Sequence, residues 1–468
     1  MLRALILKEW LTSLLELRFV VCAALCVILG IVSVVVLRAD LEARRAEFSQ
    51  NQSLYKDQAQ EYGSFRQLER QGVRVDRPPQ SFQVLFYGVE KTLDRTAVVS
   101  DDFLPGFEGD LNTNPAVLLF PVADLLFVVA VVLSLLAFFI SYDTVAGERE
   151  SGTLMLLMSY SVPRDLIIAA KWIGGYLSLA LPFLISLLVG ALIISLSADV
   201  PFTTTDWEAF LIAGGVSLLL LAVMFSIGLL VSVRARSSTT SILSLLALWV
   251  LLALVVPNLG PYVAELVSPV PDVGQVEREI ALRSKQIADT YQADWGSIRA
   301  RMRGLSREER AAFFTEIRAQ REEMQQEINK VTADVVRDFE SRLARQTDVA
   351  RVLTRVSPVA SFVYANTDIG ATGVRHEERL INHLRTYQRE FVRYVSEQTQ
   401  GQGGFGWDGG GGGGGDEYSI DELPAFAYRN DDLGSRIDAR IVDVLLLVLF
   451  SVAFFMAAFV SFLRSDIN

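Results

Sequence analysis

Cysteine and histidine are scarce in this chain of 468 residues. It has two cysteines, Cys22 and Cys26, four residues apart in one apolar run, and two histidines, His376 and His383. Two cysteines in that setting exclude a disulfide framework, a cysteine-based zinc site and haem attachment. Metal sites usually need three or four converging ligands, so no metal site is predicted. We instead expect the two histidines to be solvated positions, seven residues apart on one helix face.

The chain also lacks a nucleotide-binding motif and a basic patch. Without G-x-x-x-x-G-K-[ST] it cannot cradle and hydrolyse a nucleotide itself. No set of nucleophile, base and orienting group stands out, so no catalytic residues are predicted. The net charge of −11 argues against nucleic acid, whose phosphates bind basic surfaces. We therefore expect a chain that is not an enzyme, carries no cofactor and does not bind nucleic acid.

Long apolar runs are abundant instead. Hydrophobic residues make up 51% of the chain, more than a soluble domain of ordinary composition contains. A helix of roughly 20 residues crosses a hydrocarbon core of about 30 Å. Six apolar runs are predicted to cross the membrane: 19–37, 115–141, 166–198, 210–233, 241–257 and 441–463. The predicted fold class is an all-α polytopic membrane protein with six transmembrane helices.

The segments around these runs have patterns of their own. Residues 1–18 place polar side chains on one helical stripe and leucines opposite, as in an amphipathic helix at the membrane interface. Residues 38–114 form a first excursion, with strand-like and turn residues at 81–100. The second, 258–440, is mainly helical, and its residues 275–345 predict two long helices paired as a hairpin. Within it, 401–415 is a glycine-rich tether.

The basic residues of the short segments mark one face of the membrane. They are Arg3, Lys8, Arg18, Arg149, Arg164, Lys171, Arg234, Arg236 and Arg464. By the positive-inside rule this face is cytoplasmic. Six spans put both termini on that side, and the two excursions are then extracytoplasmic.

A charged loop at 142–165 joins the second and third runs, and its composition suits the docking of another protein. The candidate residues are Glu148, Arg149, Glu150, Gly152, Thr153, Leu154, Leu157 and Met158. The charged residues can form charge-assisted hydrogen bonds to a partner, the glycine allows close backbone approach, and the leucines and methionine supply an apolar face. The alternative is that the charges only flank a helix at the lipid headgroups, which does not explain the two glutamates.

Two acidic residues, Asp124 and Asp443, lie near the outer ends of the second and last runs. Charge in lipid is costly and usually faces the bundle interior, so both could line an outer gate. The alternative is that each sits at headgroup depth. Pro182 and Gly190 in the third run suggest a kink and a close helix contact.

Several of these motifs together resemble the ABC-2 type permeases, the membrane subunits of type V ABC transporters. Besides the six runs, they are Lys8-Glu9 and Asp143…Glu148-Arg149…Gly152-Thr153-Leu154…Ser161-Val162-Pro163-Arg164…Lys171. Others resemble the subgroup with a large extracytoplasmic insertion before the last span, related to permeases of nitrous-oxide-reductase maturation and gliding motility. These are Arg77-Pro78-Pro79, Gly88, Ser357-Pro358, Thr367-Asp368, Arg375-His376 and Tyr387-Gln388-Arg389. Residues 369–374 separate two of these pairs more widely than is usual in that subgroup.

The resemblance implies partners and a function. In that family the loop between the second and third spans forms a coupling helix that docks in a cleft of a separate ATP-binding subunit, which binds ATP and Mg²⁺; the matching residues here are 148–158. A dimer with a second copy or a sister permease, a bacterial inner-membrane location and a periplasmic partner are also expected. Hydrolysis would drive export of an unknown substrate. The alternatives are a mechanical role on an extracytoplasmic partner without solute transport, and a membrane anchor with no ATPase, which leaves the charged loop unexplained.

Overall fold

A computed structural model describes residues 2–91, 95–100, 106–108, 124–159, 162–197, 200, 202–292, 307–402, 419–420 and 422–464. The chain divides into two compact units. The larger contains Met1–Val255 and Ser357–Asn468, and the smaller contains Val256–Val356. The expected outer segment 258–440 is therefore divided between them. Most of the predicted glycine-rich tether, from residue 403 onward, and the first residues of the second apolar run lie outside the described residues.

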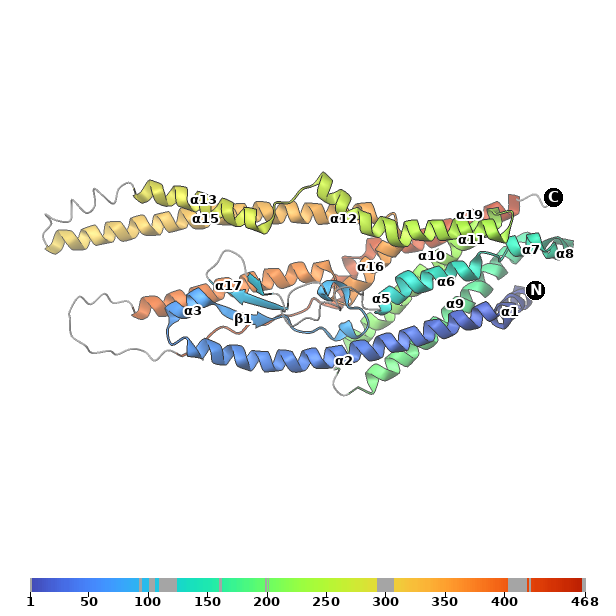
Figure 1. Ribbon diagram of the computed structural model, residues 1–468, viewed down its shortest axis with the longest axis horizontal. Coiled ribbons are helices and arrows are strands. Elements are labelled where there is room, and N and C mark those ends of the chain that lie inside the picture. Colours follow the sequence, from blue (N-terminus) through green and yellow to red (C-terminus); the bar gives the residue numbers. More distant parts are fainter. Residues whose placement is uncertain are drawn as a thin grey trace. The chain divides into compact units, whose positions relative to one another are not determined.

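The larger unit is mainly helical (Figure 1). Its elements are α1 (Leu2–Leu15), α2 (Leu17–Glu61), α3 (Phe65–Gln71), β1 (Val73–Asp76), η1 (Ser81–Val84), η2 (Gly88–Lys91), β2 (Thr96–Val99), β3 (Gly106–Glu108), α5 (Leu125–Phe127), η3 (Val128–Leu133), α6 (Ser134–Ser141), α7 (Ala146–Glu150), α8 (Thr153–Ser159), α9 (Arg164–Ser195), α10 (Thr204–Arg234), α11 (Ser238–Trp249), η4 (Val250–Val255), α16 (Pro358–Ile369), α17 (Val374–Gln402), α18 (Leu433–Asp438) and α19 (Ile441–Arg464). The segments η3 and η4 are π-helical.

Among the described residues, six helices are long and apolar enough to cross a membrane. They are Leu17–Glu61, Leu125–Glu150, Arg164–Ser195, Thr204–Arg234, Ser238–Val267 and Ile441–Arg464. This confirms the predicted all-α polytopic membrane fold. The first helix does not end with its apolar run. It continues into the charged region, where ion pairs one turn apart such as Arg38–Glu42 stabilise helix without lipid.

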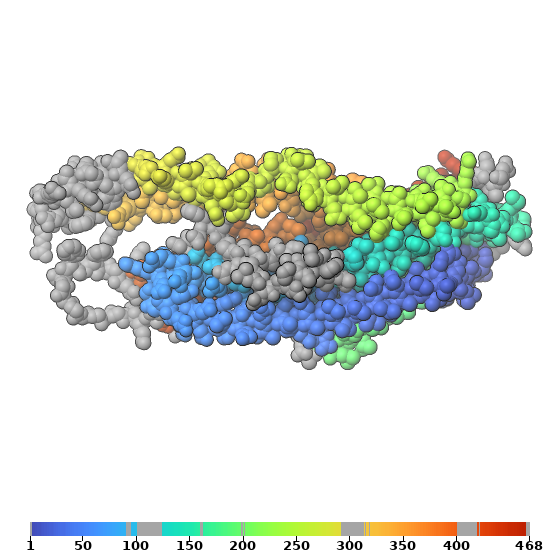
Figure 2. Space-filling view, viewed as in Figure 1, coloured from blue at the N-terminus to red at the C-terminus, as the bar shows by residue number. Residues whose placement is uncertain are grey.

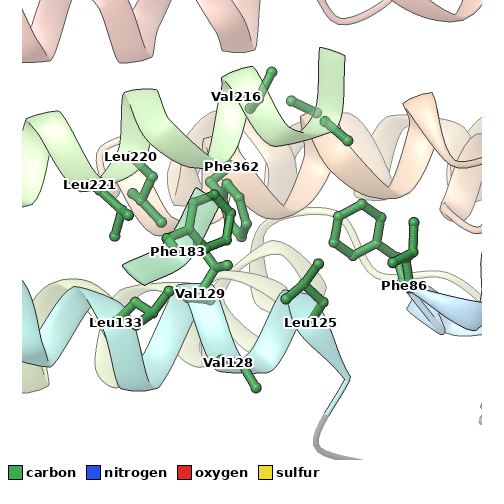
Figure 3. Packing of buried hydrophobic residues seen from close by; sticks show 14 of the residues in the cluster. Phe86, Leu125, Val128, Val129, Leu133, Phe183, Val216, Leu220, Leu221 and Phe362 are labelled. Atoms are coloured by element: carbon green, nitrogen blue, oxygen red, sulfur yellow. The ribbon is translucent and has the colours of Figure 1, made fainter. Parts of the chain in front are cut away.

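The central helix of the larger unit is α10. In the most apolar stretch of 18 residues of α10, 78% of the residues are buried within the protein, whereas in the corresponding stretch of the first helix 28% are buried. A helix that is apolar all round is a core helix, and α10 packs against α6, α9, α11, α16 and α19. Figure 3 shows Leu220 and Leu221 of α10 meeting Phe183 of α9 and Phe362 of α16.

The outer helices of the bundle keep apolar side chains exposed. On α2 these include Val20, Ile28 and Val32, each more than half exposed, and Figure 2 shows α2, in blue, at the surface of the larger unit. Such side chains need no protein cover in lipid. Close approach between helices is confirmed at Gly190, where a Cβ would lie 3.3 Å from Val34 Cγ2 of α2.

The polar part of the larger unit contains the three strands. The sheet has the order β1-β2-β3 and is antiparallel, with Val73 opposite Val99 and Ala97 opposite Phe107. Apolar residues of the sheet share a core with α3 and with α17, to which Leu380 and Phe391 contribute. This excursion is thus a small folded body.

The smaller unit consists of α12 (Val256–Val267), α13 (Val273–Gln292) and α15 (Arg307–Thr354). Both α12 and α13 pack against α15. The α13–α15 contact buries Val276, Ile280 and Val335. The predicted pairing of two long helices is therefore confirmed.

The two histidines of α17 have different surroundings. His376 is only 6% exposed, so the prediction that it is a solvated position is wrong, whereas His383 is exposed. Both rings meet Tyr428 edge-on, as expected for residues on one helix face, and His376 Nδ1 lies 2.9 Å from the Tyr428 hydroxyl. The amphipathic α17 buries the first histidine because the chain returns across it at residue 428.

We expect His376 to make folding stability pH-dependent. Burial, followed by the charges of Arg77, Arg436 and Arg379, lowers its pKa to about 3. Below pH 6.5 the unfolded chain binds a proton that the folded chain does not, so stability falls by about 1.4 kcal/mol per pH unit. In thermal unfolding at pH 7 and pH 5, His376→Gln should lessen the loss by ~2 kcal/mol.

His383→Gln is the matched control for that experiment, because the exposed His383 lies on the same helix and meets the same tyrosine. It should leave the pH dependence unchanged. An equal effect of the two substitutions would contradict a buried neutral His376.

Candidate functional site

The charged loop between α6 and α9 contains two short helices, α7 and α8. Gly152 joins them with a φ of +75°, a left-handed conformation that glycine adopts without strain. Nothing lies within 4 Å of the position that a Cβ on residue 152 would occupy among the described residues. The positive φ, and not a lack of space for a side chain, therefore favours glycine at this position. The hydroxyl of Thr153 donates to the carbonyl oxygen of Glu148 at 3.3 Å, which holds the turn between the helices.

Two of the three charged candidates in α7 are bonded to the connection between α10 and α11. The Arg149 guanidinium donates to the carbonyl oxygens of Ala235 at 2.6 Å and Val233 at 3.1 Å. A carboxylate oxygen of Glu150 accepts from the Ser238 amide at 3.0 Å. A cation at the C-terminus of one helix and an anion at the N-terminus of the next are both favourable. Both side chains therefore fix α7 in place.

The third, Glu148, belongs to a buried charge network. Lys171 of α9 has a side chain that is 1% exposed, and its ammonium lies 2.7 Å from Glu148 Oε1 and 3.3 Å from Glu9 Oε2 of α1. Buried charges persist only when paired. We call Glu9, Glu148 and Lys171 the lysine network. It joins α1, α7 and α9 at one point.

A further contact connects the loop with the start of α2. Arg18 Nη1 lies 2.7 Å from Asp143 Oδ2 and donates to the Tyr142 hydroxyl at 2.6 Å. The amides of Val145 and Ala146 both donate to Ser232 Oγ of α10 at 3.1 Å. The loop is thus bonded to α1, α2, α9, α10 and α11.

The apolar candidates of α8 point inward. Leu154 is 1% exposed, and Leu157 and Met158 are partly buried in a cluster that includes Ile168 and Phe462. The side chains left outside are Met155, 61% exposed, and Leu156, 65% exposed. Sequence reasoning did not include these two among the candidate docking residues.

The exposed residues of this loop form one surface. We call it the α8 surface; it consists of Glu150, Ser151, Gly152, Thr153, Met155, Leu156 and Ser159. Of the predicted docking residues, the structure brings Glu150, Gly152 and Thr153 to this surface, with Glu150 also bonded to Ser238, and places the others in contacts inside the chain. Contact of any of them with a partner stays a prediction.

The two candidate gate residues are also bonded within the chain. Asp124 caps α5: its Oδ1 accepts from the Phe127 amide at 2.7 Å and its Oδ2 from the Tyr87 amide at 3.0 Å. Asp443 is 0% exposed and lies 3.9 Å from Arg440 Nη1. These contacts give both carboxylates a structural role, and an outer gate stays a prediction.

Comparison with known proteins shows the family to which this sequence belongs. The sequence model described as ABC-2 family transporter protein matches residues 3–467. The chain belongs to the ABC-2 transporter family. This ABC-2 family chain is also 33% identical over 134 residues to a probable ABC transporter permease protein NosY of Pseudomonas aeruginosa, covering 27% of the chain and 46% of that protein. A probable ABC transporter permease protein NosY of Stutzerimonas stutzeri is 38% identical over 78 residues, 17% of the chain and 28% of that protein.

The chain spans less than half the length of these curated relatives. Membership of the family agrees with the resemblance seen in the charged loop and in the six apolar runs. A multi-pass membrane protein follows from the family and the six helices together.

Proposed function

We propose that this chain is the permease subunit of an ABC transporter and that the α8 surface docks a separate ATP-binding subunit. The observation that carries the proposal is the exposure of Met155 and Leu156 at the tip of a loop whose charged side chains are bonded inside the chain. Adjacent exposed apolar side chains on a fixed helix suit a protein contact. ATP and Mg²⁺ would be bound by the partner, and the loop would face the cytoplasm of a bacterial inner membrane.

The bonds of the loop suggest how a push on α8 would reach the bundle. Lys171 connects α7 with α1 and α9, Arg149 connects it with α10, and Arg18 connects the loop with α2. Rigid elements with fixed contacts move together. A displacement of the α8 surface during ATP hydrolysis would therefore be shared by the membrane helices α2, α9 and α10 and by the N-terminal helix α1. In a dimer with a second copy or a sister permease, such movement would drive export of a substrate.

The docking assignment is tested with the double substitution Met155→Asp/Leu156→Asp. Two carboxylates on the α8 surface should weaken binding of the ATP-binding subunit by at least tenfold, about 1.4 kcal/mol, because an apolar contact is replaced by charges that must be desolvated. Both side chains are exposed, so thermal unfolding of the permease should be unchanged. Co-purification of the ATP-binding subunit and stimulation of its ATPase are the measurements.

Leu54→Asp is the control for this test, since Leu54 is an exposed leucine on the polar part of α2. It should leave both co-purification and ATPase stimulation at the level of the unsubstituted protein. If the double substitution at Met155 and Leu156 behaved like Leu54→Asp, the α8 surface would not be the docking site.

A second candidate function is mechanical, and the continuity of α2 favours it. At 1.5 Å per residue its 45 residues extend about 68 Å, more than twice a hydrocarbon core. Beyond its apolar part, Asn51 donates to Asp76 Oδ2 of β1 at 2.7 Å. Such a helix would carry ATP-driven movement to an extracytoplasmic partner without a solute crossing. Distances between labels on α2 and α17 that change under ATP turnover, in vesicles that export no solute, would favour this role.

A further inference from the structure

A small pocket with charged side chains in its wall lies in the larger unit, away from the loop that carries α8. It is lined by side chains of α16, α17 and α18 and by the chain between residues 428 and 431. Three arginines line it, together with two aspartates; these five are Arg375, Arg379, Arg436, Asp368 and Asp431. Tyr428 and His376 also line the pocket.

Both aspartates are already paired with arginine. Asp368 forms an ion pair with Arg440, which reaches it from the start of α19, and Asp431 forms one with Arg379. The arginines therefore largely neutralise the negative charge of the two aspartates in the absence of a ligand. The arginines of the pocket and its immediate surroundings outnumber these carboxylates.

The other two arginines lack such a partner. Within the described part of the chain, no carboxylate lies within ion-pair distance of Arg375 or Arg436; they donate instead to the carbonyl oxygens of Ser435 at 3.4 Å and Ile369 at 2.8 Å. Arg436 is 9% exposed, and its Nε has no hydrogen-bond partner among the described residues. A buried guanidinium N–H without an acceptor lowers the stability of the folded protein, and a bound ligand that supplies an acceptor would remove this penalty.

The surroundings disfavour the charged form of these arginines. Burial lowers the pKa of Arg436 and of Arg379, and Arg375 lowers the latter further. His376 is neutral and so adds no charge of its own. Asp432 and Asp206 act on Arg436 only from beyond ion-pair distance. A negative ligand would relieve the cost of keeping these guanidinium groups together.

The pocket also lies close to the membrane-spanning part of the last helix. Arg436 is in α18, and the apolar α19 begins at Ile441. Ile441 follows Arg436 by only five residues, so the pocket lies near the first end of this span.

We propose that this pocket binds a phosphate-type oxyanion, supplied by a phospholipid headgroup or by free phosphate, with Arg375 and Arg436 as its ligands. The planar guanidinium offers paired N–H donors that match the oxygens of a phosphate, and such charge-assisted bonds are short and strong. Arg436 Nε supplies one donor that has no acceptor in the protein. Arg379 and Arg440 offset the negative charge of the two aspartates by pairing with them.

The test uses the full chain, purified in a neutral detergent and depleted of lipid, in a buffer free of phosphate. One arm titrates inorganic phosphate by calorimetry. The other adds phosphatidylglycerol to the lipid-depleted protein and counts the molecules retained on it by native mass spectrometry. We expect binding in at least one arm, and we expect Arg375→Gln and Arg436→Gln each to weaken it at least tenfold. Arg389→Gln, on an exposed arginine of the same helix α17 that does not line the pocket, should bind as the unsubstituted protein does.

The outcomes separate the two sources of the anion. Binding of inorganic phosphate assigns a free ion, and retention of phosphatidylglycerol without phosphate binding assigns a headgroup. Arg375→Gln keeps the test decisive if Arg436→Gln does not fold, because Arg375 makes a single long bond to Ser435. The proposal is overturned if neither probe binds, or if Arg375→Gln binds as tightly as Arg389→Gln.

Discussion

Lys171→Met is expected to destabilise the protein by about 3–5 kcal/mol and to abolish coupling to the ATP-binding subunit. The substitution removes the one ammonium that lies between Glu9 and Glu148. Two carboxylates then face each other in a place where the lysine side chain was 1% exposed. Breaking a buried ion pair by removing one partner is costly because a charge is left uncompensated. Thermal unfolding in detergent measures the first effect, and stimulation of the partner's ATPase measures the second.

Lys8→Met is the matched control. Lys8 also pairs with Glu9, at 3.4 Å, but its side chain is 54% exposed. Exposed ion pairs contribute less than about 1 kcal/mol, so this variant should unfold and couple like the unsubstituted protein. Equal stability of the two variants would contradict a stabilising lysine network.

Stability and coupling can be separated with a third variant. In Glu9→Gln/Glu148→Gln/Lys171→Met the buried ammonium is removed together with both carboxylates and only the exposed Lys8 loses a partner, so much of the lost stability should return. If the network transmits movement from α7 to α1, coupling should stay low in this variant although the protein folds. Recovery of coupling together with stability would mean that the network only holds the fold.

The parts of this structure that the sequence predicts are those with a local signal. An apolar run of about 20 residues is visible without knowing any contact, and six such runs led directly to the six helices. The end of α2 was not predicted, because hydropathy marks where lipid ends and not where a helix ends. The charged part of α2 continues as helix on its own propensity and ion pairs.

The candidate site shows where sequence reasoning stops. The loop and its charged residues were found from composition, but their partners are far along the chain: Arg149 meets Ala235, and Lys171 meets Glu9. No spacing rule relates such positions. The direction of the apolar face of α8 was not predicted either: Leu154, Leu157 and Met158 were candidates for contact with a partner, and in the structure they pack inside the chain. Seven residues are too few for a periodic pattern to distinguish the two faces.

Arg440→Met is the second substitution for which we expect a large effect, again about 3–5 kcal/mol of lost stability. Arg440 is 4% exposed at the start of α19. It pairs with Asp368 of α16 and lies 3.9 Å from Asp443. Without the guanidinium, both buried carboxylates lose the positive charge that they face. Thermal unfolding of the purified protein measures the change.

Arg464→Met, at the opposite end of α19, is the control, since Arg464 is exposed and should contribute little. Because α16 packs on both α10 and α19, the pair between Asp368 and Arg440 connects the polar part of the larger unit with the last span. Asp368→Asn/Arg440→Met/Asp443→Asn removes all three charges and should regain stability. If Arg440→Met alone unfolded like Arg464→Met, this buried cluster would not hold α16 to α19, and apolar packing around Phe362 would be the contact that does.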